Sequence, residues 1–126
     1  RWGFSIGCSP DGLIRRDGMI ECKSRRQKYQ IETILTGGVP IDYVIQCQTA
    51  LLVTERKWLD FISYCGGMPM YVCRVEPDER IQEMIVDAAS AFEERLQAAM
   101  QVYRDRIDGM EPRIDTERRT EVEITL

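Results

Sequence analysis

The sequence predicts an α/β (α+β) fold in which a small mixed β-sheet is flanked by helices, and two kinds of pattern support it. Short apolar runs separated by Asp-Gly and Gly-Gly predict β-hairpins. From Asp78 onward, apolar residues recur every three or four positions, which is the period of an amphipathic helix. The 126 residues, 44% hydrophobic and 30% charged, are typical of one globular domain. No apolar run approaches the ~18 residues of a membrane-spanning helix, so a transmembrane protein is excluded.

Three short strands are expected near the start of the chain. The apolar run Phe4–Ser9 favours a strand that ends at the turn signature Pro10-Asp11-Gly12. Leu13–Arg15 and Met19–Lys23 are expected to pair as a hairpin around Asp17-Gly18, because glycine accepts the positive φ of the favoured two-residue turns.

Two helices are expected next. A helical pattern covers Gln27–Leu35, and Gly37-Gly38 ends it. A second helix is expected from Pro40, which suits a first helical turn, to about Val53.

A second hairpin is expected from two runs that are rich in aromatic and β-branched residues, Trp58–Cys65 and Met70–Val75. Its aromatic side chains Trp58, Phe61 and Tyr64 could stack on nucleobases, but a buried sheet face is the favoured interpretation.

One long helix is expected from Asp78 to about Gly109, and its apolar stripe is expected to be core. The stripe consists of Ile81, Ile85, Ala88, Phe92, Leu96, Met100, Tyr103 and Ile107. The predicted domain is therefore residues 1–108, followed by a charged C-terminal tail, 109–126, with Val122–Leu126 as a candidate edge strand.

Histidine is absent, and this excludes several kinds of catalytic site. Ser-His-Asp and Cys-His nucleophiles, histidine zinc sites and HNH-type nucleases all need that residue. Five cysteines without a CxxC pair favour buried, reduced thiols in a cytoplasmic protein. Charge is uneven: residues 1–28 carry seven basic and three acidic groups, and residues 76–126 carry seven and fourteen. A basic first third is compatible with an anion-binding face.

The strand Met19–Lys23 carries the residues with the clearest chemistry. Side chains alternate across a strand, so Glu21 and Lys23 project from one face, about 7 Å apart at their Cα atoms. Asp11 can join them only if the Pro-Asp-Gly bend breaks the regular alternation. Two carboxylates can hold Mg²⁺, and the lysine can orient or deprotonate the attacking water, or stabilise charge on a phosphate. The alternative is a solvated strand face with an incidental ion pair.

Three motifs together resemble the phage lambda exonuclease family, also called YqaJ-like viral recombinases, of the PD-(D/E)xK nuclease superfamily. The motifs are Ser9-Pro10-Asp11-Gly12, Glu21-Cys22-Lys23 and Tyr43-Val44-Ile45-Gln46-Cys47-Gln48. The resemblance covers roughly residues 2–105. It implies a restriction-endonuclease-like core over residues 1–108.

The resemblance also implies a role for particular residues. Asp11 and Glu21 match the metal-binding carboxylates, and the backbone carbonyl of Cys22 matches a further metal ligand. Lys23 matches the catalytic lysine, and Gln46 matches a glutamine near the scissile phosphate.

DNA contacts are expected around this set. The basic run that follows the lysine favours phosphate contacts, although a solvated loop is the alternative. Gln48 lies about 200° from Gln46 around the helix, so a structural role is expected for it. The residues expected to bind DNA are Ser9, Arg25, Arg26, Lys28 and Tyr43.

The resemblance implies a Mg²⁺-dependent deoxyribonuclease of the alkaline exonuclease type, with Mn²⁺ as a substitute metal. It would act on double-stranded DNA ends, 5′ to 3′, in phage-type recombination in a bacterial or phage-infected cell. The alternatives are a structure-specific endonuclease on the same fold and a catalytically silent DNA-binding module. Family resemblance further implies a ring-shaped homotrimer and a single-strand annealing partner.

One departure from the family leads to a further expectation. The family has an upstream helical segment that supplies another acidic ligand and an arginine for the terminal 5′-phosphate. Only ten residues precede Asp11, and none is acidic. We therefore expect a fragment that cleaves DNA poorly and does not prefer 5′-phosphorylated ends.

Overall fold

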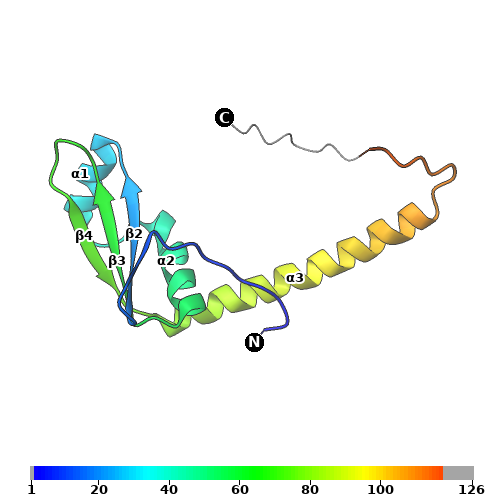
Figure 1. Cartoon of the computed structure of the whole chain (residues 1–126), viewed down its shortest axis with the longest axis horizontal. Helices are drawn as coiled ribbons and strands as arrows, with labels where there is room; N and C mark the ends of the chain where they lie inside the picture. The colour runs from blue at the N-terminus through cyan, green and yellow to red at the C-terminus, as the bar shows by residue number, and fades with distance from the viewer. Residues whose placement is uncertain (1, 118–126) are drawn as a thin grey trace. The chain divides into compact units, whose positions relative to one another are not determined.

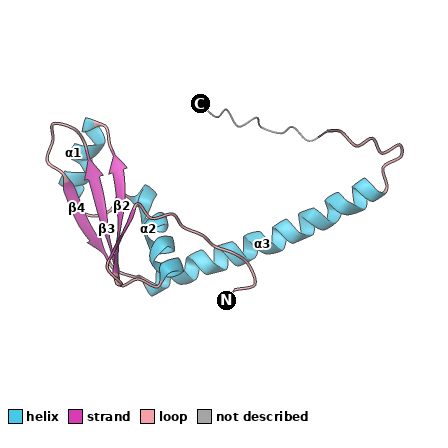
Figure 2. Ribbon diagram, viewed as in Figure 1, coloured by secondary structure: helices cyan, strands magenta, loops and turns pink. Residues whose placement is uncertain are grey.

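The computed structural model describes residues 2–117 and contains a four-stranded mixed sheet with three helices (Figure 1). The predicted fold class, a small mixed sheet flanked by helices, is confirmed, with one strand fewer than expected. The strands are β1 (Gly12–Ile14), β2 (Gly18–Ser24), β3 (Trp58–Tyr64) and β4 (Tyr71–Val75). They lie in the order β1-β2-β3-β4 (Figure 2). β2 and β3 are parallel, and the two outer pairs are antiparallel hairpins.

The connection between the two parallel strands consists of the helices α1 (Gln27–Thr36) and α2 (Ile41–Thr54). Parallel neighbours need such a crossover, because a tight turn can join only antiparallel strands. Both helices contact β3. The start of α2 lies near the end of β2, because Tyr43 of α2 contacts Arg25, the residue that follows β2. The third helix, α3 (Glu79–Asp108), follows β4. None of the described helices is both long enough and apolar enough to cross a bilayer.

The predicted strand Phe4–Ser9 is wrong, because this segment has no strand pairing. The sheet ends at β1, which pairs with β2 along three residues only. A β-compatible run becomes a strand only when an edge is available to accept its hydrogen bonds. The predicted edge strand at Val122–Leu126 lies outside the described residues.

The register between β2 and β3 depends on a close approach at Gly18. Gly18 pairs with Trp58, and a Cβ built on Gly18 would lie 2.1 Å from a ring carbon of Trp58. No side chain fits there, so Gly18, the first residue of β2, admits the indole to the sheet. The expected two-residue turn is wrong, because Ile14 pairs with Gly18 across a three-residue loop whose positive φ lies at Arg15 and not at the glycine.

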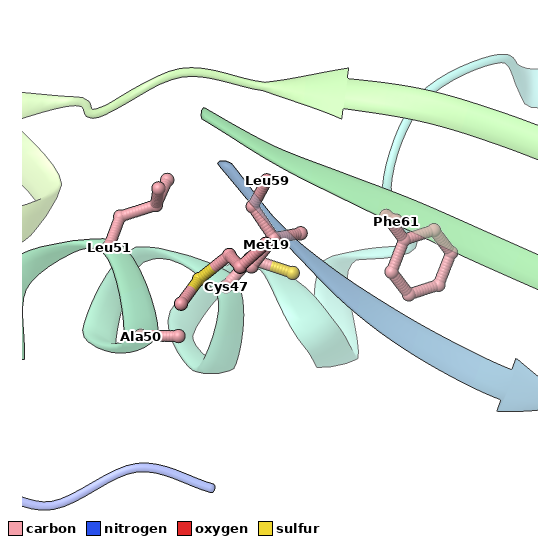
Figure 3. Packing of buried hydrophobic residues seen from close by; sticks show 6 residues of the cluster. All are labelled: Met19, Cys47, Ala50, Leu51, Leu59 and Phe61. Atoms are coloured by element: carbon pink, nitrogen blue, oxygen red, sulfur yellow. The ribbon is translucent and has the colours of Figure 1, made fainter. Parts of the chain in front are cut away.

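The hydrophobic core lies between the sheet and α2 (Figure 3). β2 contributes Met19 and β3 contributes Leu59 and Phe61, all at most 1% exposed. Their positions follow the two-residue alternation of buried strand side chains. Figure 3 shows them facing Cys47, Ala50 and Leu51 of α2.

Two buried glutamines connect the elements around this core. Gln30 of α1 donates from Nε2 to the carbonyl oxygens of Ser63 (3.1 Å) and Pro69 (2.8 Å), and its Oε1 accepts from the Ser63 hydroxyl (2.5 Å). Gln48 of α2 donates to the Glu76 carbonyl and accepts from the Asp78 amide, where α3 begins. The structural role predicted for Gln48 is therefore confirmed.

The chain divides into two compact units, residues 1–91 and residues 92–126, and the boundary falls within α3. No residue of α3 is buried, so the prediction that its apolar stripe is core is wrong for the described chain. In the second unit, Phe92 is 57% exposed and Tyr103 is 66% exposed. Helical periodicity identifies the apolar side of a helix, but it carries no information about what covers that side.

We predict that Gln30→Leu lowers the free energy of unfolding by about 2–4 kcal/mol. The change keeps the side chain's approximate volume, but it leaves the buried Ser63 hydroxyl and carbonyl without their partner, at about 1–3 kcal/mol for each unsatisfied group, and it removes the part-buried bond to the Pro69 carbonyl. Urea unfolding followed by circular dichroism measures the loss. Gln27→Leu, an exposed position on the same helix, is the matched control; an equal loss in both variants would contradict the prediction.

Candidate active site

Glu21 and Lys23 lie on the inward face of β2, as the alternation predicted. Glu21 follows the core residue Met19 on this face and is only 4% exposed. Lys23 Nζ lies 2.6 Å from Glu21 Oε1. The alternative of a solvated strand face is therefore wrong, because the carboxylate is buried and its ion pair is shielded from water.

Gln46 gives Glu21 a second partner. Gln46 Nε2 donates to Glu21 Oε1 at 2.7 Å. The next residue of α2, Cys47, is buried in the core, so the packing of the helix fixes the position of Gln46 opposite β2. Both bonds go to the same carboxylate oxygen, and the other oxygen, Oε2, receives neither of them.

Asp11 reaches the same region through the irregular bend that the sequence analysis required. Gly12 pairs with Ile20, so Asp11 directly precedes the regular ladder. Its Oδ2 accepts the backbone N–H of Cys22 at 2.7 Å. The bend therefore holds the exposed Asp11 carboxylate beside the strand segment that carries Glu21 and Lys23.

The charges at this site keep Lys23 protonated. The hydrogen bond to Glu21 raises the pKa of Lys23 above its ordinary value; burial opposes this rise, and the negative charges of Glu21 and Asp11 add to it. A raised lysine pKa favours the ammonium at neutral pH. Lys23 therefore presents a positive charge and hydrogen-bond donors to the space beside the two carboxylates.

The donor set fits a hard divalent cation such as Mg²⁺. The ligand atoms available are the oxygens of Asp11, Glu21 and the Cys22 carbonyl. Within residues 2–117 no group of three or more histidine, cysteine or acidic side chains is placed to hold a metal. Mg²⁺ commonly binds through one or two carboxylates, with water and substrate phosphate as further ligands. The two carboxylates therefore provide a partial shell that a phosphate group could complete.

A groove lined by charged and aromatic side chains adjoins this site, and its charges are two arginines, Arg25 and Arg26, and two carboxylates, Glu32 and Asp42. Tyr43 of α2 packs on Phe61, with ring centroids 5.6 Å apart, and Lys23 Nζ lies 5.1 Å from the Tyr43 ring centre. Arg25 Cζ lies 5.2 Å from the Tyr43 ring and 5.2 Å from the Tyr29 ring. The groove has a volume of about 740 Å³, and its wall includes Arg25, Arg26, Tyr29, Thr33, Asp42 and Tyr43.

The other residues expected to bind DNA are placed differently. Arg26 is exposed on the groove wall. Lys28 is exposed with its Nζ 4.6 Å from the Tyr29 ring, and Ser9 is exposed two residues before Asp11. Sequence reasoning missed Tyr29, although an aromatic residue directly after a basic run could have indicated it.

The three aromatic residues of the second hairpin take different positions. Phe61 is fully buried, as favoured. Trp58 lies under the Arg74 guanidinium, whose Cζ is 3.8 Å from the ring centre. Tyr64 is 54% exposed, so the expectation of one buried aromatic face is wrong for this residue. Trp58 and Tyr64 share the strand face opposite to Phe61, because side chains alternate.

The cysteines also differ from expectation in part. Cys47 and Cys65 are buried, whereas Cys22 is exposed and Cys8 and Cys73 are half-buried. All five are free thiols. The expectation of buried thiols is therefore confirmed for two of them and wrong for Cys22.

The chain is similar to known proteins in sequence and in fold. The family model described as YqaJ-like viral recombinase domain matches residues 4–57, which contain Asp11, Glu21, Lys23 and Gln46. A crystal structure of an alkaline exonuclease (LHK-Exo) from Laribacter hongkongensis matches with a TM-score of 0.74 and 35% sequence identity, over 78% of this chain and 53% of that chain. LHK-Exo in complex with dAMP matches with a TM-score of 0.73 and 35% identity, over 78% and 52%.

The chain thus spans about half the length of the solved structures that it matches. No curated protein sequence matches it. The shared fold is that of the PD-(D/E)xK nucleases, which confirms the predicted fold class and the predicted family resemblance.

We predict that the Cys47 thiol resists alkylation in the folded chain. Burial raises its pKa to about 11, with the Glu21 charge as the next cause. At pH 8.5 fewer than about one such thiol in a hundred is ionised, and only the thiolate reacts. Iodoacetamide labelling followed by peptide mass spectrometry should find Cys47 unmodified until guanidinium is added. Labelling of Cys47 as fast as that of exposed Cys22 would contradict the prediction.

Proposed function

We propose that this chain, of which residues 4–57 match the YqaJ-like viral recombinase domain, forms the catalytic core of a metal-dependent DNA exonuclease of the alkaline exonuclease type, acting in recombination. The observation that carries the proposal is the Glu21 cluster. A buried carboxylate held by Lys23 and Gln46, with Asp11 beside the same strand, combines metal ligands with a fixed positive charge.

A metal ion would be held by Asp11, Glu21 and the Cys22 carbonyl. When bound, Mg²⁺, or Mn²⁺ in its place, would lower the pKa of a water molecule and offset the negative charge of the phosphate. The residues themselves supply positioning: Gln46 fixes the Glu21 carboxylate, and the Cys22 N–H fixes the Asp11 carboxylate.

Lys23 would act as a cation in this chemistry. Its pKa is raised by Glu21, so at neutral pH it is a hydrogen-bond donor and not a base. Such a donor can orient the attacking water and stabilise the negative charge that develops on the phosphate oxygens. The basic residues that follow, Arg25, Arg26 and Lys28, would contact backbone phosphates without reading sequence.

The substrate proposed is the end of double-stranded DNA, degraded 5′ to 3′. Cleavage from ends and cleavage at internal positions can use the same carboxylates and lysine. Linear and covalently closed circular duplexes of the same sequence separate the two activities. A homotrimeric ring and a single-strand annealing partner remain predictions from the family resemblance.

We predict that digestion of linear duplex DNA requires Mg²⁺ or Mn²⁺, because the ligands available are hard oxygen atoms. Release of acid-soluble nucleotides should cease in excess EDTA and return when Mg²⁺ is restored, and the circular duplex should stay intact. Asp11→Asn keeps the shape of the side chain but removes its charge, and it should raise the Mg²⁺ concentration needed for half-maximal rate. Full digestion in EDTA would disprove the proposed chemistry.

We further predict that Lys23→Met lowers kcat by about 10²–10³-fold, the usual cost of losing a donor to a developing oxyanion. Methionine keeps the length of the apolar stem, so DNA affinity in a Ca²⁺ binding assay should change little. Lys57→Met is the matched control, because Lys57 is 74% exposed and pairs with Asp17 on the surface. Near-normal turnover of Lys23→Met would show that the Glu21–Lys23 pair is only structural.

A further inference from the structure

The Tyr43 ring lies between the carboxylate site and the groove, and it forms part of the groove wall. One contact of the ring is with Phe61, at 5.6 Å between centroids and 29° between planes. Phe61 is completely buried, so this contact anchors Tyr43 to the hydrophobic core. The position of the ring is therefore set by the packing of α2 against β3.

Two cations from the end of β2 lie against the same ring. Lys23 Nζ is 5.1 Å and Arg25 Cζ is 5.2 Å from its centre, within the range of cation–π attraction. These residues are two positions apart, so they project from the same side of the chain and repel each other electrostatically. Attraction to the Tyr43 ring offsets that repulsion and keeps the two positive charges close together.

The remaining contacts of Arg25 fit this arrangement. Its backbone N–H donates to the Tyr64 carbonyl at 2.7 Å, which ties its backbone to β3. Its guanidinium also lies beside Tyr29, and its Nε is buried without a hydrogen-bond partner. The position of the guanidinium therefore depends on its contacts with the two aromatic rings and not on a hydrogen bond from Nε.

We propose that Tyr43 is a positioning residue that holds Lys23 and Arg25 together and thereby aligns the catalytic group with a DNA contact. The inference rests on the proposed nuclease function. Tyr43 and Gln46 lie one helical turn apart on α2, and they contact Lys23 and Glu21 respectively. One helix face therefore supports both charged side chains on the inward face of β2, and the contribution of Tyr43 comes from its ring rather than from its hydroxyl.

Steady-state kinetics on linear duplex DNA test this role. Tyr43→Leu should lower kcat about tenfold and raise the KM for DNA, because both Lys23 and Arg25 lose a desolvated cation–π contact. Tyr43→Phe keeps the ring and should restore both parameters to near wild type. Tyr29→Leu is the matched control, since Tyr29 contacts Arg25 but is not a contact of Lys23, and it should raise KM alone. If Tyr43→Phe is as impaired as Tyr43→Leu, the hydroxyl is the functional group and the proposal is wrong.

NMR of the lysine side chains tests the contact between Tyr43 and Lys23 without measuring enzyme activity. The chain has only three lysines, at positions 23, 28 and 57, so reductive ¹³C-methylation gives three lysine methyl signals beside that of the N-terminal amine, which its lower pKa distinguishes. Lys28→Arg and Lys57→Arg assign them. Ring-current shielding should move the Lys23 signal upfield of the Lys57 signal in wild type and Tyr43→Phe, and the shift should vanish in Tyr43→Leu. Tyr43→Met replaces the leucine variant if that variant does not fold.

The two measurements separate the possible failures. An unchanged Lys23 shift in a folded Tyr43→Leu chain would overturn the positioning role, whatever the kinetics show. A wild-type chain that binds but does not cut DNA would instead count against the proposed nuclease function. In that case the NMR shift, together with the loss of DNA affinity expected for Tyr43→Leu, still decides the role of Tyr43.

Discussion

Glu21 is a buried carboxylate in a small hydrophobic core, and most of the functional arrangement depends on how this charge is satisfied. Burying an isolated carboxylate costs several kcal/mol, so the charge must have partners. Lys23 and Gln46 provide them, and both contact the same oxygen atom. The ion pair contributes little net stability, because desolvation offsets most of its attraction. Its structural consequence is positional: β2 and α2 can pack only in the register that brings these three groups together.

The helix α2 connects the core to the chemistry. One side of it supplies the core residues Cys47, Ala50 and Leu51, and the neighbouring side supplies Tyr43 and Gln46. Residues three and four apart on a helix share a face, so these two sets are fixed relative to each other by the helix backbone. Packing against Leu59 and Phe61 therefore sets the position of the site residues, and a change in the core alters the site geometry. Gln48 extends the same dependence to the start of α3 through its bonds to Glu76 and Asp78.

The sequence predicted the features that depend on the periodicity of a single strand or helix. Strand alternation placed Glu21 and Lys23 on one face, and helical angles separated the structural Gln48 from Gln46. Periodicity did not predict the contacts between residues that are far apart in the sequence. The hydrogen bond from Cys22 to Asp11 required a bend whose direction the sequence does not specify. Arg25 between Tyr29 and Tyr43 depends on how the crossover helices pack. The exposed stripe of α3 and the unpaired run Phe4–Ser9 show the converse, because apolar periodicity and β-propensity reveal nothing about the presence of a partner.

The charge at the site gives a reason for metal and substrate to bind together. Asp11, Glu21 and Lys23 leave a formal charge of minus one, which repels a phosphodiester of the same sign. Under the proposed function, a divalent cation would neutralise the site and the bound phosphodiester together, since each of these two carries a charge of minus one. The phosphate would also supply metal ligands beyond the two carboxylates. Each would then raise the affinity of the other, since coupling between two ligands is reciprocal. The basic residues at the end of β2 lie outside this balance. Under the same proposed function they would attract the DNA backbone before the cation is bound, so capture of DNA and assembly of the reactive site would be separate steps, the first at the segment that leads from β2 into α1 and the second on β2.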